Sequence, residues 1–329
     1  MTERRLYCGI DVHKESFVGC ITDEKGIPIR QHKFPPTKEG VEHFVAGISS
    51  AEITIAIEAC GLWRAAYKLL HEMGYTVKLA NPVKTNQIAC KKKTDKVDAQ
   101  ILANLLRTNY LPEVYIPDEN TLQLRDITRH KTRITRMRTQ IQNRIKAHLL
   151  QNGIDYPKQM WNRKQLKKFE DLENLHLNDL IDTYKYFEKR QKHILKKIEE
   201  LANKNQMAKL LMTHPGIGAF GALMMIAEIG DIDRFRYTKQ LISYAGHAPG
   251  IYQTGNTSFA VKNTAVNKWL KWIVGECSGR AAQFDPNYKR TFNEVKKEKG
   301  FKIARREIAR KMLRTVYFML KNEEEYHAS

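Results

Sequence analysis

The sequence has few cysteines and no long uncharged apolar stretch. Its five cysteines are scattered over 329 residues without a CxxC pair, which excludes the common zinc motifs and a disulfide framework, so we expect free and mostly buried thiols. No run of about 18 uncharged apolar residues is present, which excludes a transmembrane helix. The polar start, MTERRLYCGI, does not resemble a signal peptide. We therefore expect a cytoplasmic protein without a membrane partner.

Acidic residues are also scarce relative to basic ones. The chain has 36 Asp and Glu against 56 Lys and Arg, a formal net charge of +20. This excess is larger than solubility requires and predicts a polyanionic partner, for which nucleic acid is the first candidate and an anionic membrane surface the alternative. The hydrophobic content of 42% is sufficient for two or three domains with cores of their own.

The N-terminal region, residues 1–117, alternates between strand-like and helix-like periods. We expect strands at 6–11, 16–22, 29–34, 53–58 and 76–80, a turn at 23–26, and helices from Thr37 and over 62–73. Three strands, helix, strand, helix, strand is the order of an α/β ribonuclease-H-like (RuvC-like) fold. A final helix over 95–107, with Thr94 as its N-cap, closes this domain.

A basic helical hairpin is expected over residues 118–205. Ile127, Ile134 and Ile141 recur every seven residues, and a second apolar stripe over 184–201 fits a return helix, which together predict an antiparallel coiled coil that can also dimerise. Residues 121–168 contain thirteen Lys and Arg but only two acidic residues. A solvated helical spacer is the alternative. The candidate phosphate contacts on this hairpin are Arg129, Arg133, Arg136 and Arg144.

The C-terminal region, residues 206–329, is expected to be mainly helical. Pro215-Gly216-Ile217-Gly218 precedes an apolar helix, as in a helix-hairpin-helix element. There Gly216 and Gly218 would let backbone amides approach a nucleic-acid phosphate, although an ordinary turn uses the same residue types. A basic amphipathic helix is expected over residues 296–321.

Four carboxylates occur where a two-metal site needs them. Asp11 and Glu58 end two neighbouring strands, and Asp95 and Asp98 are three residues apart on one helix face. Such a set can hold two Mg²⁺ ions about 4 Å apart, with Mn²⁺ as a substitute. Taken singly, each aspartate has a simpler interpretation as a solvated, turn or capping residue. Glu58 is harder to explain in that way, because it ends a buried strand.

These motifs resemble a known family. GIDVHKE from Gly9, AIEACG from Ala56 and KTDKVDAQILANLL from Lys93 look like the successive motifs of the DEDD transposases of a bacterial insertion-sequence family, which are relatives of the Piv DNA invertases. PGIGAFGALMMIAEIGDIDRF from Pro215 and SYAGHAPGIYQTGN from Ser243 are similar to the C-terminal transposase domain of that family, in which a serine beside a glycine attacks DNA. The similarity is collinear and covers nearly the whole chain.

The resemblance implies a set of roles. Asp11, Glu58, Asp95 and Asp98 would be metal ligands, and Thr254 occupies the place of the nucleophilic serine, which is a departure from the family pattern. Ser258 is the alternative nucleophile and Ser243 a weaker one. The implied reaction cleaves and rejoins DNA through a covalent protein–DNA link. The implied partners are donor and target DNA, a guide RNA, and further copies of the chain in a dimer or tetramer, associated with the nucleoid of a bacterium or archaeon.

Two other functions remain open at this point. The first is a metal-dependent nuclease of the junction-resolving kind, in which water attacks and no covalent link forms. The second is an inactivated relative that only binds nucleic acid. The threonine at position 254 favours the inactivated relative, whereas the intact set of four carboxylates opposes it.

Overall fold

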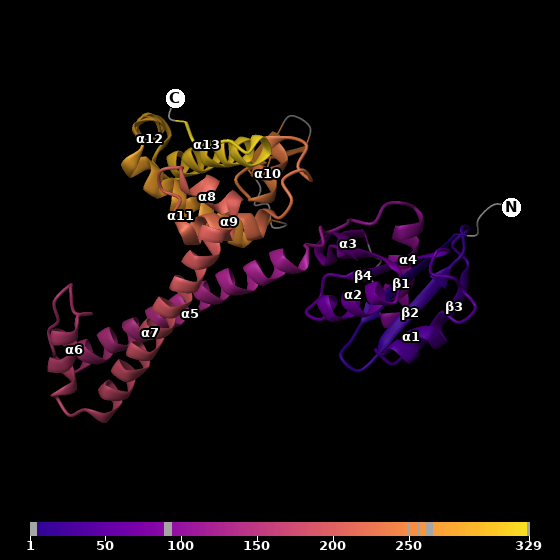
Figure 1. Ribbon diagram of the computed structural model, residues 1–329, viewed down its shortest axis with the longest axis horizontal. Helices are drawn as coiled ribbons and strands as arrows, with labels where there is room; N and C mark the ends of the chain where they lie inside the picture. Colours follow the sequence, from indigo (N-terminus) through magenta and orange to yellow (C-terminus); the bar gives the residue numbers. More distant parts are fainter. Residues whose placement is uncertain (1–4, 89–93, 249–250, 255–256, 261–265, 328–329) are drawn as a thin grey trace. The chain divides into compact units, whose positions relative to one another are not determined.

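The chain forms two compact units. The computed structural model describes residues 5–88, 94–248, 251–254, 257–260 and 266–327, with 251–254 and 257–260 described by their backbone only. The units are Met1–Ile116 and Pro117–Ser329, and Figure 1 colours them along the sequence. The first boundary lies within one residue of the expected one. Residues 118–205 and 206–329 share one unit, because the end of the helical hairpin packs into the core of the C-terminal helices.

The first unit is built on a five-stranded sheet with the order β3-β2-β1-β4-β5. The central strand β1 pairs antiparallel with β2 and parallel with β4. Each strand agrees with its expected range to within one residue at either end. The bounds are β1 (Leu6–Val12), β2 (Phe17–Thr22), β3 (Pro28–Phe34), β4 (Ile53–Glu58) and β5 (Thr76–Ala80).

Helices cover both faces of this sheet. One face packs against α1 (Lys38–Phe44) and α2 (Trp63–Glu72) through a core that includes Ile10, Ile57 and Leu70. The other face packs against α4 (Asp95–Arg107), which begins after the Thr94 N-cap as expected. A short helix, α3 (Pro82–Ile88), was not expected from the sequence. Of the described cysteines, Cys8, Cys20 and Cys277 are buried free thiols and Cys60 is a partly exposed one.

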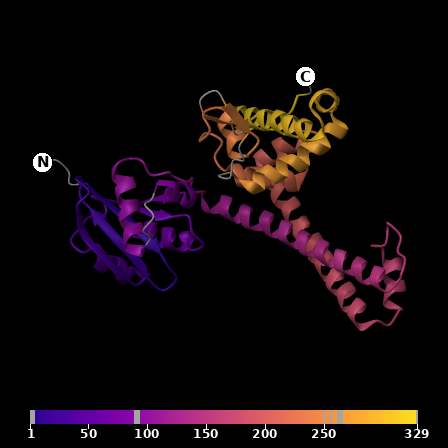
Figure 2. The same cartoon turned by 180° about the vertical axis from the view of Figure 1, so that it is seen from behind.

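The second unit begins with a long helical hairpin. It consists of α5 (Glu119–Gln151), α6 (Arg163–Glu170) and α7 (Leu175–Lys204), and both views show α5 and α7 side by side (Figures 1 and 2). Ile134 shares a buried cluster with Ile198, whereas Ile145, further along α5, shares one with Tyr184. The residue numbers of α5 increase from the first cluster to the second, whereas those of α7 decrease, so the two helices are antiparallel.

The buried stripe of α5 differs from the expected apolar one. Met137 is 45% exposed although it follows Ile134 by three residues, and Thr128 and Thr132 are buried instead. Their hydroxyls donate to helix carbonyls four residues earlier, Thr128 to Leu124 (2.7 Å) and Thr132 to Thr128 (3.0 Å). A threonine whose hydroxyl bonds to its own helix can face a core without leaving a polar group unpaired, so apolar periodicity alone misses it.

The rest of the second unit is mainly helical, as expected. The elements are α8 (Gln206–Met212), α9 (Ala219–Ile229), α10 (Thr238–Tyr244), β6 (Ile251–Thr254), β7 (Thr257–Ala260), α11 (Lys268–Phe284), α12 (Pro286–Lys299) and α13 (Phe301–Asn322). The prediction of one helix over 296–321 is wrong. Gly300, with φ of 82°, ends α12 and starts α13, because a positive φ interrupts a right-handed helix. No helix in the described ranges combines the length and apolar character that a membrane span needs.

Candidate functional site

The register between β1 and β4 brings Asp11 and Glu58 to one edge of the sheet. The strands are parallel, with Gly9 opposite Ala56 and Ile10 opposite Ile57, so Asp11 and Glu58 are the next residues along each strand. Side chains alternate between the two faces of a sheet, so these two carboxylates share the face of Gly9 and Ala56. That is the face covered by α4, because Ala56 shares a buried cluster with Leu102 and Leu106 of α4.

Gly9 sets how closely α4 approaches this face. A Cβ built on Gly9 would lie 2.0 Å from the carbonyl oxygen of Ala99 and 2.6 Å from the amide nitrogen of Ala103. The absence of a side chain therefore lets the backbone of α4 lie directly on β1. The first turn of α4, which carries Asp95 and Asp98, is thereby held near the end of β1.

His13 joins the carboxylates from the two elements. Its Nε2 lies 3.1 Å from Oδ2 of Asp11 and 3.5 Å from Oδ2 of Asp95, and one ligand atom of each residue falls within 4.8 Å of the others. Two carboxylates and an imidazole are suitable ligands for a divalent cation. Asp95 is 61% and His13 47% exposed at the side chain, so an ion can reach the group from solvent.

The electrostatics of Asp11 also fit a cation site. Burial raises the pKa of the Asp11 carboxyl, the nearby His13 opposes that increase, and repulsion from Asp95 and Asp98 adds to it. Like charges brought together disfavour the ionised form of each. A bound divalent cation would relieve this repulsion. Metal ions and protons therefore compete for the carboxylates of such a cluster.

The sequence prediction named four ligands and missed a fifth candidate. The structure brings Asp11 and Asp95 together with His13, places Asp98 close enough to raise the pKa of Asp11, and puts Glu58 on the adjacent strand. His13 was not predicted. The available signal was its spacing, because residues two apart on an extended chain point to the same side, and Asp11 and His13 have that spacing.

The two candidate nucleophiles lie on one hairpin in the second unit. Thr254 ends β6 and pairs with Thr257 of β7, while Ser258 pairs with Gln253. Gly255, on which the choice of Thr254 partly depends, lies outside the described residues, as do Gly250 and Asn256. The motif that begins at Ser243 starts in the last residues of the helix α10 and includes the strand β6. Ser243, the weaker candidate, lies within α10.

The four arginines chosen on α5 have different environments. Arg129 is committed to an ion pair, since its Nε and Nη2 donate to the two carboxylate oxygens of Glu228 (2.7 and 2.8 Å), whose side chain is fully buried. We therefore remove Arg129 from the candidate phosphate contacts. Arg136 is exposed and lies over the ring of Trp269, 5.2 Å from its centroid. Arg133 and Arg144 are exposed.

The two glycines before α9 also differ from each other. Gly216 has φ of 93°, and a Cβ there would lie 2.5 Å from the amide nitrogen of Ala281 and 2.7 Å from the carbonyl oxygen of Cys277. Gly216 is therefore required for close packing against α11. Gly218 is exposed and precedes α9 without a side-chain cap, so no N-cap side chain makes a hydrogen bond to the first amides of this helix. Of the two, Gly218 is the better candidate to approach a phosphate.

Two transposase family models match the chain in order. A model described as a transposase, the DEDD type of IS110, matches residues 8–153, and a model described as a transposase of the IS116/IS110/IS902 family matches residues 208–293. The first includes Asp11, Glu58, Asp95 and Asp98. The second includes Thr254 and Ser258.

Curated relatives of the chain are described as transposases or as pilin gene-inverting proteins. A putative transposase of Sinorhizobium fredii is 27% identical over 66% of this chain, which corresponds to 55% of that relative's own length. A transposase for the insertion sequence element IS1111A of Coxiella burnetii is 23% identical over 75% of this chain and 70% of the relative. A pilin gene-inverting protein of Moraxella bovis is 25% identical over 98% of both chains. The chain therefore carries two transposase domains of the IS110/IS116 type in collinear order, and a relative matches it over 98% of both chains.

Proposed function

We propose that this protein is a DNA transposase or site-specific recombinase that cleaves and rejoins DNA strands with divalent metal ions. The observation that carries the proposal is the convergence of Asp11, His13 and Asp95 at the junction of β1 and α4, with Asp98 and Glu58 beside them. The strand order of the first unit is β3-β2-β1-β4-β5. β1, β4 and β5 are parallel to one another, whereas β2 is antiparallel to both of its neighbours. This arrangement supports a RuvC-like assignment.

The metal centre would use the carboxylates of the first unit. Asp11, Asp95, Asp98 and Glu58 supply hard oxygen ligands, which favour Mg²⁺ and admit Mn²⁺. A bound divalent ion stabilises negative charge on a phosphodiester and favours deprotonation of the attacking oxygen. Asp11 is held by its strand and by His13, so its carboxylate is oriented before an ion binds.

The nucleophile would be the hydroxyl of Thr254, with Ser258 as the alternative. The oxygen attacks a phosphodiester phosphorus, the deoxyribose oxygen leaves with a proton, and a protein–DNA phosphoester forms. Reversal of this step on a second strand rejoins the DNA. A threonine can perform this step, although its methyl group restricts χ1 and crowds the oxygen.

Nucleic acid would be bound by the basic face of α5 and by the turn before α9. Arg133, Arg136 and Arg144 are exposed cations on one long helix, and Gly218 is an exposed N-cap of α9 with no side-chain hydrogen bond to its first amides. The matched transposase domains support DNA as the substrate. A guide RNA as a further partner and a homo-oligomer as the working form are proposed from the sequence resemblance alone.

Metal titration tests the proposed centre. The variants Asp11→Asn, Glu58→Gln and Asp98→Asn each remove one charged ligand with little change in volume, so they should weaken Mg²⁺ and Mn²⁺ binding in calorimetric titration and abolish strand cleavage. Binding of a DNA fragment should change little. Unaltered metal affinity in all three variants would refute the centre.

Adduct trapping tests the nucleophile. On suicide DNA substrates, Thr254→Ser should retain or raise the yield of covalent adduct, Thr254→Val should abolish it, and Ser258→Ala should have a modest effect. Peptide mapping of the attached residue then identifies the attacking oxygen, and an adduct mapped to Ser258 would transfer the role to it. Absence of any adduct with cleavage intact would favour the water-attacking nuclease, whose metal ligands all lie in the first unit.

A further inference from the structure

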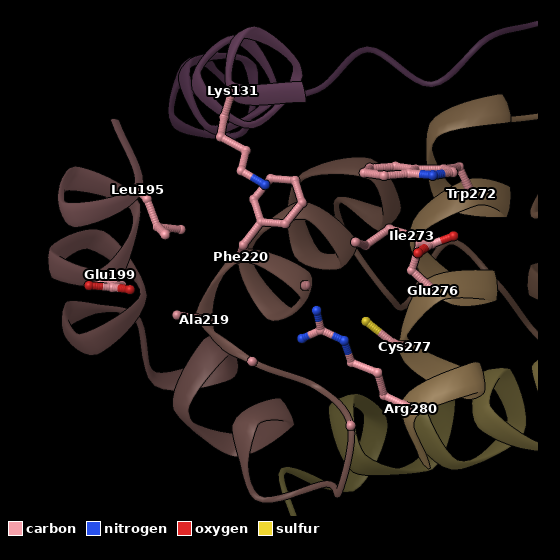
Figure 3. Close-up of a pocket in the computed structure, with 13 residues that line it drawn as sticks. Lys131, Leu195, Glu199, Ala219, Phe220, Trp272, Ile273, Glu276, Cys277 and Arg280 are labelled. Atoms are coloured by element: carbon pink, nitrogen blue, oxygen red, sulfur yellow. The ribbon is translucent and has the colours of Figure 1, made fainter. Parts of the chain in front are cut away.

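A cavity in the second unit has the features of a site for a single nucleotide, and we propose that it binds one unpaired nucleotide of the nucleic-acid substrate. It lies between α5, α7, α9 and α11 (Figure 3). Its volume of about 380 Å³ falls in the range of small-molecule pockets, roughly 300–1,000 Å³. The inference rests on the proposed binding of nucleic acid and adds to it a defined place for one base.

Aromatic side chains form part of the wall. Phe220 of α9 and Trp272 of α11 are in contact, with ring centroids 6.2 Å apart and an interplanar angle of 59°. Nζ of Lys131 lies 3.9 Å from the centroid of Phe220 and so occupies one face of that ring. Since the two rings touch, no base can enter between them, and the base would stack on the Trp272 indole. An exposed aromatic face accepts any base, because every base has a π surface.

Two cations point into the same space. In Figure 3 the guanidinium of Arg280 extends between α9 and α11, with Lys131 above it. Burial and the positive charges of Arg138 and Arg280 lower the pKa of Lys131. Neither Lys131 nor Arg280 forms an ion pair with a carboxylate in the part of the chain that the structure describes, so both remain available to a phosphate.

The lining also contains two carboxylates, which can accept hydrogen bonds from a base. This feature favours a nucleotide over a free phosphate as the ligand. Glu199 and Glu276 are exposed at the edge of the cavity, so their charges balance those of Lys131 and Arg280. A balanced lining attracts inorganic phosphate weakly. It suits a nucleotide, whose phosphate faces Arg280 and whose base can donate an amino group to a carboxylate. Gly218, Ala219 and Gly221, at the start of α9, line the same cavity, and this helix has no side-chain cap.

Fluorescence of a base analogue in the full-length protein tests this site. The probe is a short single-stranded oligodeoxynucleotide with one 2-aminopurine, whose emission is quenched when the base stacks on an indole. Unaltered protein should quench the probe, and Trp272→Leu should remove the quench and weaken binding about tenfold, the effect typical of losing one stacked base. Trp272→Phe should restore binding, which a merely disturbed fold would not allow.

A matched pair of arginine variants tests the phosphate contact. Arg280→Gln should weaken binding several-fold and reduce the quench, whereas Arg306→Gln, which removes the same charge from an exposed position on α13 outside the cavity, should leave the quench unchanged. An equal quench in Trp272→Leu, or full displacement of the probe by millimolar inorganic phosphate, would overturn the nucleotide site. So would an unaltered protein that binds the oligonucleotide without quenching it. If the unaltered protein quenches the probe but shows no metal-dependent cleavage of DNA, the proposed function alone is refuted.

Discussion

Arg129 and Arg133 are separated by one turn of α5 but have different physical roles. The carboxylate of Glu228 is fully buried, and it accepts hydrogen bonds from Arg129 and from Nδ2 of Asn267 (2.8 Å). Arg125 Nε lies 3.9 Å from the same carboxylate. A buried charge is tolerated only when it is paired and hydrogen-bonded. Arg129 therefore helps to hold α5 against α9 and α11.

This difference predicts opposite phenotypes for the two arginines. Arg129→Ala would leave Glu228 without its main partner and should lower the free energy of unfolding by about 3–5 kcal/mol. Arg133→Ala, at an exposed position, should change it by no more than about 0.5 kcal/mol while reducing nucleic-acid affinity. Urea unfolding followed by circular dichroism measures the free energy of unfolding of both variants. Equal stability of the two variants would contradict the structural role of Arg129.

His247 makes stability dependent on pH. Burial, together with the positive charges of Lys271 and Arg310, lowers its pKa to about 4. The unfolded chain, with an ordinary histidine pKa near 6.5, therefore binds more protons than the folded chain between these two values. Stability should fall as the pH decreases from about 6.5 to about 4, by an amount on the order of 3 kcal/mol.

The variant His247→Leu isolates this effect. It removes the titrating group from a buried position, so the difference in unfolding free energy between wild type and variant should itself change with pH over that interval. Thermal unfolding at a series of pH values measures it. A difference that stays constant with pH would show that His247 is protonated equally in both states.

At the scale of elements, the metal centre depends on how α4 packs on β1. The atoms nearest to a Cβ built on Gly9 belong to Ala99, Leu102 and Ala103, so a side chain there would overlap the backbone of α4. Gly9→Ala should therefore displace the first turn of α4, lower stability by about 1–3 kcal/mol as overpacking does, and weaken Mg²⁺ binding. Gly61→Ala is the control, because nothing lies within 4 Å of a Cβ there. Unchanged metal affinity in Gly9→Ala would show that the ligands tolerate movement of α4.

The exposed cations of α5 can be tested as a group. If Arg133, Arg136 and Arg144 contact phosphates, replacing all three with glutamine should reduce affinity for every sequence and flatten the log–log salt dependence by about one unit per lost contact. Sequence preference should hardly change. Fluorescence anisotropy over a range of salt concentrations measures the slope, and an unaltered slope would assign this face of the hairpin to spacing or to self-association.

At the scale of the whole molecule, the two units have separate cores. The core of the first unit includes Ile10, Ile57 and Leu70, and that of the second includes Met224, Leu270 and Met312. We therefore expect two calorimetric transitions for the full chain. Only the transition of the first unit should rise with Mg²⁺ or Mn²⁺, since a ligand stabilises only the unit that binds it. Asp11→Asn should abolish that shift, and a metal-dependent shift of both transitions would contradict independent units.

The elements of the first unit and most of its candidate ligands follow from local sequence patterns. Ile55, Ala56 and Ile57 are buried on both faces of the sheet, and such a continuous apolar run identifies a central strand before its neighbours are known. Thr94 caps α4 through a contact with the amide of Val97, and local signals of this kind need no tertiary context. Asp11, Glu58, Asp95 and Asp98 were identifiable because strand ends and a first helical turn are local features.

Which of these side chains meet, and which cations remain available to a ligand, depends on how distant elements pack. Glu228 and Arg129 are 99 residues apart, and no local pattern indicates that one neutralises the other. The cavity lined by Lys131, Trp272 and Arg280 likewise combines separate helices. Periodicity reports which face of an element is buried, but it carries no information on what that face contacts. The partner of a side chain is set by the packing of elements distant in sequence, so pairing and cavity shape emerge only in the folded chain.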